Sequence, residues 1–319
     1  MARGLFTQGV CLLTDGQATI EDVKAALREH GFQIVREAPP ADHWALGGPT
    51  LVVAFLPQVN GHVAVDVVNQ SWPDKMGDPK SDLMTFAAWS MGHFGPFAFP
   101  GGLARARQHA WAWEPARAVS AGHRGIIRIR TSYVPGSKDD APILPKDYDP
   151  LAEMNFITRM VVALFNARGV MCYFNPNGEV LRDRTSFRAL WDESSKQNKL
   201  PLPLWMNIRF FRLGEKFVLM DTVGNEQLQI KDVEAVFSSD EYHPAHVDYY
   251  LRNVTEYLRD FNRELRTGES IDGPGKSDLS WSMEVLEKGL VEPPRRVLRL
   301  HPKADSTAIQ RALADISRA

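Results

Sequence analysis

Cysteine and net charge are both scarce in this chain. Its 319 residues include two cysteines, Cys11 and Cys172, and each lies in an apolar, strand-like run. We therefore expect buried, reduced thiols rather than a framework of disulfides. The 37 Lys and Arg residues are balanced by 39 Asp and Glu, which gives a formal net charge of -2. Because nucleic-acid-binding proteins normally carry a basic surplus, this balance argues against a nucleic-acid partner.

Signatures of common catalytic and sorting classes are also missing from the sequence. It contains no complete Walker loop and no Gly-x-Ser-x-Gly elbow, the patterns of phosphate-binding loops and of many hydrolases. The apolar run after Arg3 is stopped by Asp15 and lacks the small-residue cleavage site of a signal peptide. We therefore expect a cytoplasmic protein.

The sequence does contain a 22-residue stretch without Asp, Glu, Lys or Arg, from Leu83 to Ala104. Its length matches a membrane span, which needs about 20 apolar residues. Four glycines and two prolines fall between Gly92 and Gly102, however, and in lipid they leave backbone groups without partners. We expect a short helix that ends near Gly92, an aromatic loop, and a new helix after Gly102, with no membrane contact.

Hydrophobic periodicity predicts an α+β fold. Apolar residues recur with helical spacing in several segments, and short apolar or alternating runs between turn residues predict strands. We expect two α/β sandwich-like halves, each with a mostly antiparallel sheet packed by long helices. The main predicted helices are residues 19–30, 150–168, 184–196, 244–266 and 306–316, and the main predicted strands are 5–13, 51–56, 62–68, 125–133, 170–174, 204–213, 216–223 and 227–237.

A proline-rich segment, Pro135 to Pro150, is the predicted linker between two domains. The first domain is an N-terminal α+β domain, residues 1–135, which contains the aromatic Gly/Pro loop. The second is a C-terminal α+β domain, residues 145–302. Residues 303–319 are predicted to form a separate terminal helix that needs a partner surface. We also expect Leu298–Leu300 to close an edge of the second sheet.

Reactive side chains do not form a recognised catalytic pattern. His243 and His246 could share one helical face and hold zinc, but no further ligand is fixed by spacing, so polar residues at a helix entry are the favoured interpretation. Asp66, Glu153 and Asp221 could be acids of a site, yet nothing in one sequence pairs them in space. We expect no catalytic residue, no metal and no cofactor.

The uncharged stretch offers a candidate contact surface. Its rings either fill the core between two helices or line a groove that meets a partner, because aromatic side chains dominate both environments. Under the second interpretation the partner-binding residues are Trp89, His93, Phe94, Phe97 and Phe99. Two acids of the predicted linker, Asp139 and Asp140, are a second candidate that could attract a basic surface. A solvated loop is the alternative for these acids.

Three segments and much of the C-terminal half resemble a known family. The segments are Asn69-Gln-Ser-Trp-Pro-Asp, Phe86 to Gly102, and Cys172-Tyr-Phe-Asn-Pro-Asn-Gly-Glu. The likeness continues from Leu202 through the predicted hairpin to Gly268-Glu-Ser-Ile, and covers nearly all of residues 5–300. The family that the chain resembles is a bacterial domain of unknown function, family 4261. It has no accepted catalytic residues to carry over.

The resemblance implies a role by context. Proteins of this kind look like members of bacterial toxin neighbourhoods, so the resemblance implies an immunity protein that neutralises an effector of a type VI secretion system. We therefore expect a non-catalytic binding protein whose partner is a cognate toxin or effector. One alternative is a hydrolase-like enzyme with a pocket near His62, His93 or Cys172. Another is an adaptor that docks through its terminal helix.

Overall fold

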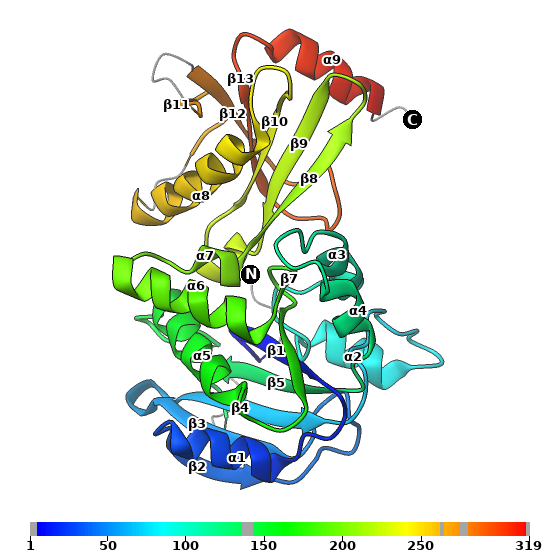
Figure 1. Ribbon diagram of the computed structural model, residues 1–319, viewed down its shortest axis with the longest axis vertical. Coiled ribbons are helices and arrows are strands. Elements are labelled where there is room, and N and C mark those ends of the chain that lie inside the picture. Colours follow the sequence, from blue (N-terminus) through cyan, green and yellow to red (C-terminus); the bar gives the residue numbers. More distant parts are fainter. Residues whose placement is uncertain (1–4, 136–142, 262–264, 275–279, 317–319) are drawn as a thin grey trace. The chain divides into compact units, whose positions relative to one another are not determined.

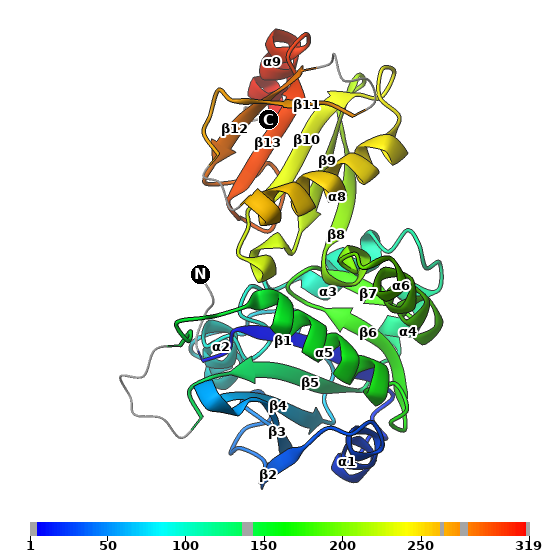
Figure 2. The same cartoon turned by 90° about the vertical axis from the view of Figure 1, so that its left-hand side faces the viewer.

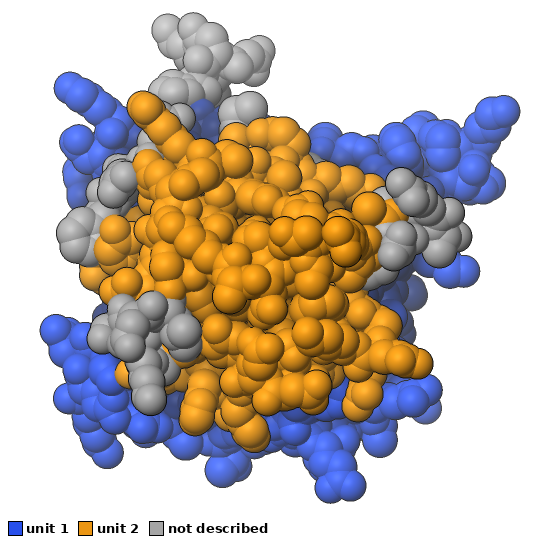
Figure 3. Space-filling view, turned by 90° about the horizontal axis from the view of Figure 1, so that it is seen from above, with its two compact units in different colours: residues 1–205 blue, residues 206–319 orange. Residues whose placement is uncertain are grey.

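The computed structural model describes residues 5–135, 143–261, 265–274 and 280–316. The chain divides into two compact units, Met1–Trp205 and Met206–Ala319, which are coloured separately in Figure 3. Each unit has its own sheet.

Unit 1, residues 1–205, is built on a seven-stranded antiparallel sheet (Figure 1). The strand order is β2-β3-β4-β5-β1-β6-β7, so the first strand of the chain lies inside the sheet. Its central strands are buried along their whole length because helices cover them. The strands are β1 (Gln8–Thr14), β2 (Ile34–Ala38), β3 (Thr50–Leu56), β4 (Gly61–Val68), β5 (Gly125–Ser132), β6 (Val170–Asn175) and β7 (Val180–Arg182).

Helices cover both faces of this sheet. Phe174 of β6 packs into a cluster with side chains of α2 (Leu83–Ser90), α3 (Gly102–Gln108) and α4 (Ala116–Ala121). The next residue back, Tyr173, contacts Phe187 of α6. Because successive side chains of a strand point to opposite faces, these helices lie on opposite sides of β6. The remaining helices of unit 1 are α1 (Ile20–Glu29) and α5 (Pro150–Leu164), which lie side by side (Figure 2), α6 (Arg184–Gln197), α7 (Leu202–Trp205) and the short η1 (Pro57–Val59).

Asp183 is the N-cap of α6, and its removal gives a first testable prediction. Its carboxylate accepts hydrogen bonds from the backbone N–H groups of Thr185 and Ser186, at 2.8 and 2.9 Å. We expect Asp183→Ala to lower the free energy of unfolding of unit 1 by about 1 kcal/mol, because two N–H groups of the first turn lose their acceptor. Urea unfolding checks this. The control is Asp192→Ala, an exposed site on the same helix, and an equal loss there contradicts the prediction.

Unit 2, residues 206–319, contains a six-stranded sheet in the order β11-β12-β13-β10-β9-β8. Strands β10 and β13 run parallel, and the other neighbours are antiparallel. Helix α8 packs on β9 and β10. Helix α9 places Ile309 and Leu313 against Phe217, Leu219 and Val236 of the sheet. The elements are β8 (Asn207–Leu213), β9 (Phe217–Val223), η2 (Asn225–Leu228), β10 (Asp232–Ser238), α8 (Pro244–Phe261), β11 (Ser270–Asp272), β12 (Ser280–Leu286), β13 (Val297–Pro302) and α9 (Ser306–Ile316).

The α+β class and the mostly antiparallel sheets are confirmed by this architecture. The predicted edge strand at Leu298–Leu300 is wrong, because β13 lies between β12 and β10. The units also divide after Trp205 rather than in the linker predicted at Pro135 to Pro150, since β6 and β7 complete the sheet of unit 1. The terminal helix, predicted as a separate segment 303–319, packs on the sheet of unit 2 as α9.

Candidate functional site

The aromatic segment predicted as a contact surface contributes mainly to the core of unit 1. Trp89 and Phe94 are 3% and 2% exposed. Their rings meet Trp72, whose centroid lies 5.8 Å from Trp89 and 5.4 Å from Phe94. Phe174 completes the group at 5.0 Å from Trp72. The three segments that carry the family resemblance therefore meet in one ring cluster.

The other predicted contact residues are placed differently. His93, Phe97 and Phe99 are half-buried, so parts of these side chains reach the surface. Asp139 and Asp140 lie outside the residues that the structure describes. The predicted partner surface is thus reduced to the outer edge of the aromatic loop.

Polar side chains hold this loop in place. The side-chain oxygen of Asn177 accepts a hydrogen bond from the backbone N–H of Phe97 at 3.0 Å, and its amide nitrogen donates to the Gly9 carbonyl. Gly95 has a φ of +121°, and a Cβ there would lie 2.6 Å from the Asn177 oxygen. Asp74 accepts from the first N–H groups of α3. These contacts give the loop a structural role.

A buried ion cluster lies beneath the aromatic loop. Asp66 of β4 and Arg128 of β5 are directly paired in register, and their side chains approach to 2.6 Å. Arg130 adds a second contact to Asp66 at 2.8 Å, and the Gly48 N–H donates to the same carboxylate at 2.9 Å. Burial alone would raise the pKa of Asp66, but the two guanidinium groups outweigh it and hold that pKa below its usual value.

His93 lies at the edge of this cluster, with Nδ1 2.8 Å from the Leu46 carbonyl oxygen and 2.9 Å from Arg130. Burial, followed by the charge of Arg130, lowers the pKa of His93 to about 3. The adjoining cavity, lined also by Cys11, measures about 10 Å³. That volume is close to the minimum for one water molecule, so no substrate fits there.

Both thiols are protonated at neutral pH. Burial raises the pKa of Cys11 well above its ordinary value and the pKa of Cys172 to about 12. A thiol of this kind packs as a small apolar group and is a poor nucleophile. His62, the remaining residue of the enzyme alternative, places its Nδ1 2.9 Å from the Asn60 carbonyl oxygen. The reactive groups of that alternative are therefore held by internal contacts.

Glu153 is a buried acid of a different kind. Its carboxylate, on α5, is fully buried and accepts hydrogen bonds from the hydroxyls of Thr7 and Tyr148, each at 2.7 Å. Burial raises its pKa to about 7, and the two hydroxyl contacts offset only part of that effect. Such a group titrates near neutral pH inside the fold.

In unit 2 a row of charged side chains crosses the sheet. Five residues on five neighbouring strands are in register and so share one face: Arg209, Asp221, Glu234, Arg299 and Glu284. Arg209 and Asp221 form two hydrogen bonds, at 2.9 and 2.6 Å. Arg299 approaches Glu234 at 2.5 Å. The row therefore contains two buried ion pairs, Arg209–Asp221 and Arg299–Glu234, and we call it the ion ladder of this sheet.

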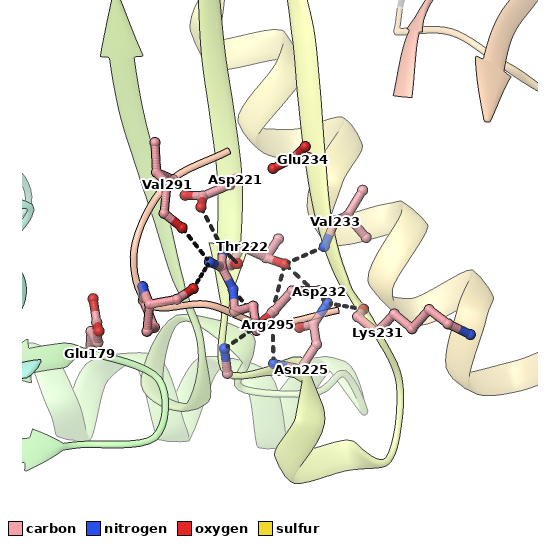
Figure 4. Close-up of polar contacts among 12 residues, drawn as sticks. Glu179, Asp221, Thr222, Asn225, Lys231, Asp232, Val233, Glu234, Val291 and Arg295 are labelled. Carbon is pink, nitrogen blue, oxygen red and sulfur yellow. Dashed lines mark hydrogen bonds and ion pairs between the residues drawn. The ribbon is translucent and has the colours of Figure 1, made fainter. Parts of the chain in front are cut away.

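Arg295 extends this ladder from the loop before β13 (Figure 4). Its guanidinium contacts Asp221 at 2.5 Å and Asp232 at 2.9 Å. Asp232 also accepts from the Thr222 hydroxyl and from the Asn225 N–H. Burial alone would raise the pKa of Asp221, but Arg295 and Arg209 outweigh it and hold the pKa low. Asp221 is thus an ionised structural anchor, with its oxygens occupied by arginines.

The histidine pair weighed as a zinc site lies on the surface at the start of α8. His243 and His246 are exposed, and their ring centroids are 5.6 Å apart. Among the residues that the structure describes, no three His, Cys, Asp or Glu side chains are grouped so that they could hold a metal ion.

An open groove lies between α8 and β11 in unit 2. It has a volume of about 410 Å³, which falls within the range of ligand-binding pockets. Its lining comprises two tyrosines, two aliphatic side chains and three polar ones: Tyr250, Tyr257, Val254, Ile271, Asn253, Ser270 and Asp272. We call it the α8–β11 groove and take it as the candidate functional site.

Fold and site together define an α+β protein with two sheet-and-helix units and a surface groove in the second. Residues 221–301 of that second unit match a family described as "Domain of unknown function (DUF4261)". The matched segment is similar to this family and contains α8 and β11. No curated protein and no solved structure matches the chain. Within the described part of the chain, no helix is both long and apolar enough to cross a bilayer.

The groove was missed by sequence reasoning. The apolar stripe of α8 placed Tyr250 in the core, where it is 9% exposed. Two further tyrosines of the same helix, Tyr249 and Tyr257, lie away from the centre of the apolar stripe and are 66% and 36% exposed. Exposed tyrosines at such positions are a sequence signal that could have indicated a contact surface on α8. The opposite wall could not be placed, because β11 was not predicted as a strand.

Proposed function

We propose that this chain is a non-catalytic binding protein, and that it serves as a cytoplasmic immunity protein of bacteria that neutralises a secreted type VI effector by direct contact. The observation that carries the binding role is the α8–β11 groove, an open site of about 410 Å³ with tyrosines in its wall. Tyrosine is enriched at the energetic centres of protein interfaces. The family resemblance supports the immunity role.

Three further observations favour binding over catalysis. The thiols are held protonated by burial, and His93 sits beside a cavity of single-water size. The conspicuous charged side chains, such as Asp66 and Asp221, are occupied by arginines. A nucleophile or general base needs access to substrate and a pKa close to the working pH, so these residues support a structural role.

Co-purification tests the proposed function. The chain is expressed with an affinity tag together with the product of the adjacent gene, and the eluate is analysed by size exclusion. We expect a stoichiometric complex, because a stable pair buries about 800 Å² on each partner. Co-expression should also protect cells from that product. Separate elution of the two proteins, with no protection, contradicts the proposal.

A further inference from the structure

The α8–β11 groove has a wall with an unsatisfied polar group. Tyr250 stacks edge-on against Trp281, with ring centroids 5.4 Å apart, and Trp281 pairs in register with Ile271 of β11. This packing fixes the ring of Tyr250 in the wall of the groove. Its hydroxyl is buried and has no hydrogen-bond partner among the residues that the structure describes. A buried hydroxyl without a partner costs free energy, which a polar ligand group recovers.

The charge of the groove is negative. Asp272 is its one charged lining residue in the described part of the chain, is exposed, and makes no ion pair with any described residue. The arginines of the neighbouring helix are already engaged, Arg252 with Asp248 at 2.9 Å and Arg259 with Asp260. The carboxylate of Asp272 therefore remains available to a cation from outside.

Aromatic rings beside a carboxylate form a cation-binding arrangement. The faces of tyrosine rings attract ammonium and guanidinium groups through their quadrupole, and Asp272 adds a charge-assisted hydrogen bond. Burial and then the charge of Asp272 raise the pKa of Tyr250, so its hydroxyl stays protonated and uncharged, and a hydroxyl oxygen can accept a hydrogen bond. Asn253 and Ser270 at the rim can accept further N–H groups.

We propose that the α8–β11 groove binds a basic side chain, arginine or lysine, that a protein partner presents. The charge of Asp272, the rings of Tyr250 and Tyr257, and the free hydroxyl of Tyr250 together select a cation with several N–H donors. The inference rests on the proposed binding function and adds to it the surface used and the chemistry recognised.

A peptide titration tests the groove directly. The probe is a capped Gly-Ser-Gly-Arg-Gly-Ser-Gly peptide added to the isotope-labelled full chain, and the readout is the NMR shift of backbone amides. We expect saturable shifts at residues 250–257 and 270–272. Asp272→Asn should weaken the affinity about fivefold, as expected for the loss of one partly exposed ion pair. Tyr257→Ala and a salt concentration of about 0.5 M should weaken it as well.

Matched controls separate charge recognition from nonspecific attraction. Asp240→Asn removes an exposed carboxylate outside the groove and should leave the affinity unchanged. A peptide with Gln in place of Arg should bind at least fivefold more weakly. Equal affinities for the two peptides, or unchanged binding by Asp272→Asn and Tyr257→Ala together, overturn the inference.

The two proposals fail in different ways. If the adjacent gene product forms a complex that Asp272→Asn and Tyr257→Ala leave at full affinity, the groove is not the contact, while the binding function stands. If the arginine peptide binds as expected but the gene product neither binds nor is neutralised, the cation site stands and the immunity role is wrong.

Discussion

Asp221→Asn should destabilise unit 2 by about 3–5 kcal/mol. The substitution keeps the shape of the side chain but removes its charge, so Arg209 loses the carboxylate of Asp221 inside the sheet and Arg295 keeps only that of Asp232. Arg209 and Arg295 are 1% and 8% exposed, so water cannot replace the carboxylate. Breaking a buried ion pair by removing one partner has this cost because a desolvated charge is left uncompensated. Hydrogen exchange of the β9 and β10 amides measures the loss.

A surface ion pair in the same unit provides the control. Glu287 and Arg296 lie 3.0 Å apart, with side chains 80% and 55% exposed. Glu287→Gln should change the free energy of unfolding by less than about 1 kcal/mol, because exposed pairs are screened by solvent. Equal effects of the two substitutions would show that Asp221 is not a structural anchor of unit 2.

Unit 1 should lose about 3 kcal/mol of stability as the pH rises from 4.5 to above 7, through Glu153 alone. The folded pKa is raised from 4.5 to about 7, so the folded state holds its proton more tightly than the unfolded chain. The stabilising contribution is therefore complete below pH 4.5 and is lost as the pH rises through about 7. Each unit of pKa shift corresponds to about 1.4 kcal/mol.

The measurement is the difference in unfolding free energy between the natural chain and Glu153→Gln across this pH range. Seven of the eight tryptophans lie in unit 1, Trp281 being the exception, so tryptophan fluorescence in urea reports on that unit. From the low to the high end of this pH range, the natural chain should lose about 3 kcal/mol of unfolding free energy relative to Glu153→Gln. Glu29→Gln, at an exposed site, should give a flat difference. If the unfolding free energies of Glu153→Gln and of the natural chain change in parallel with pH, the pKa of Glu153 is not raised.

Secondary structure could be predicted where the hydrophobic periodicity continues without interruption over a long segment. Helix α8 begins at Pro244 as expected, and α9 has the predicted bounds of residues 306–316. Strand β12 was missed although its residues alternate as a strand should, with Trp281 and Met283 inward. The position of β13 inside the sheet could not be inferred, because a short apolar run is compatible with an edge or a centre.

The ion ladder could not be predicted from the sequence, because its ion pairs depend on the register between β8 and β9. A two-residue turn at Gly214-Glu215, as predicted, would place Arg209 opposite Met220. The structure has a three-residue loop, 214–216, and Arg209 faces Asp221 instead. A shift of one residue exchanges the two faces of a strand. Arg295 lies 74 residues further along the chain from Asp221, a separation that no local pattern spans.

The central place of β13 has a consequence for biosynthesis. Strands β8, β9 and β10 leave the ribosome long before β13, yet β12 and β11 join the sheet only through it. The nascent second unit therefore has an open edge on β10 until residue 302 has emerged. Unit 1 carries no such delay at its C-terminal end, because its sheet is complete once β7 has been made, and it can fold while the rest is still being translated.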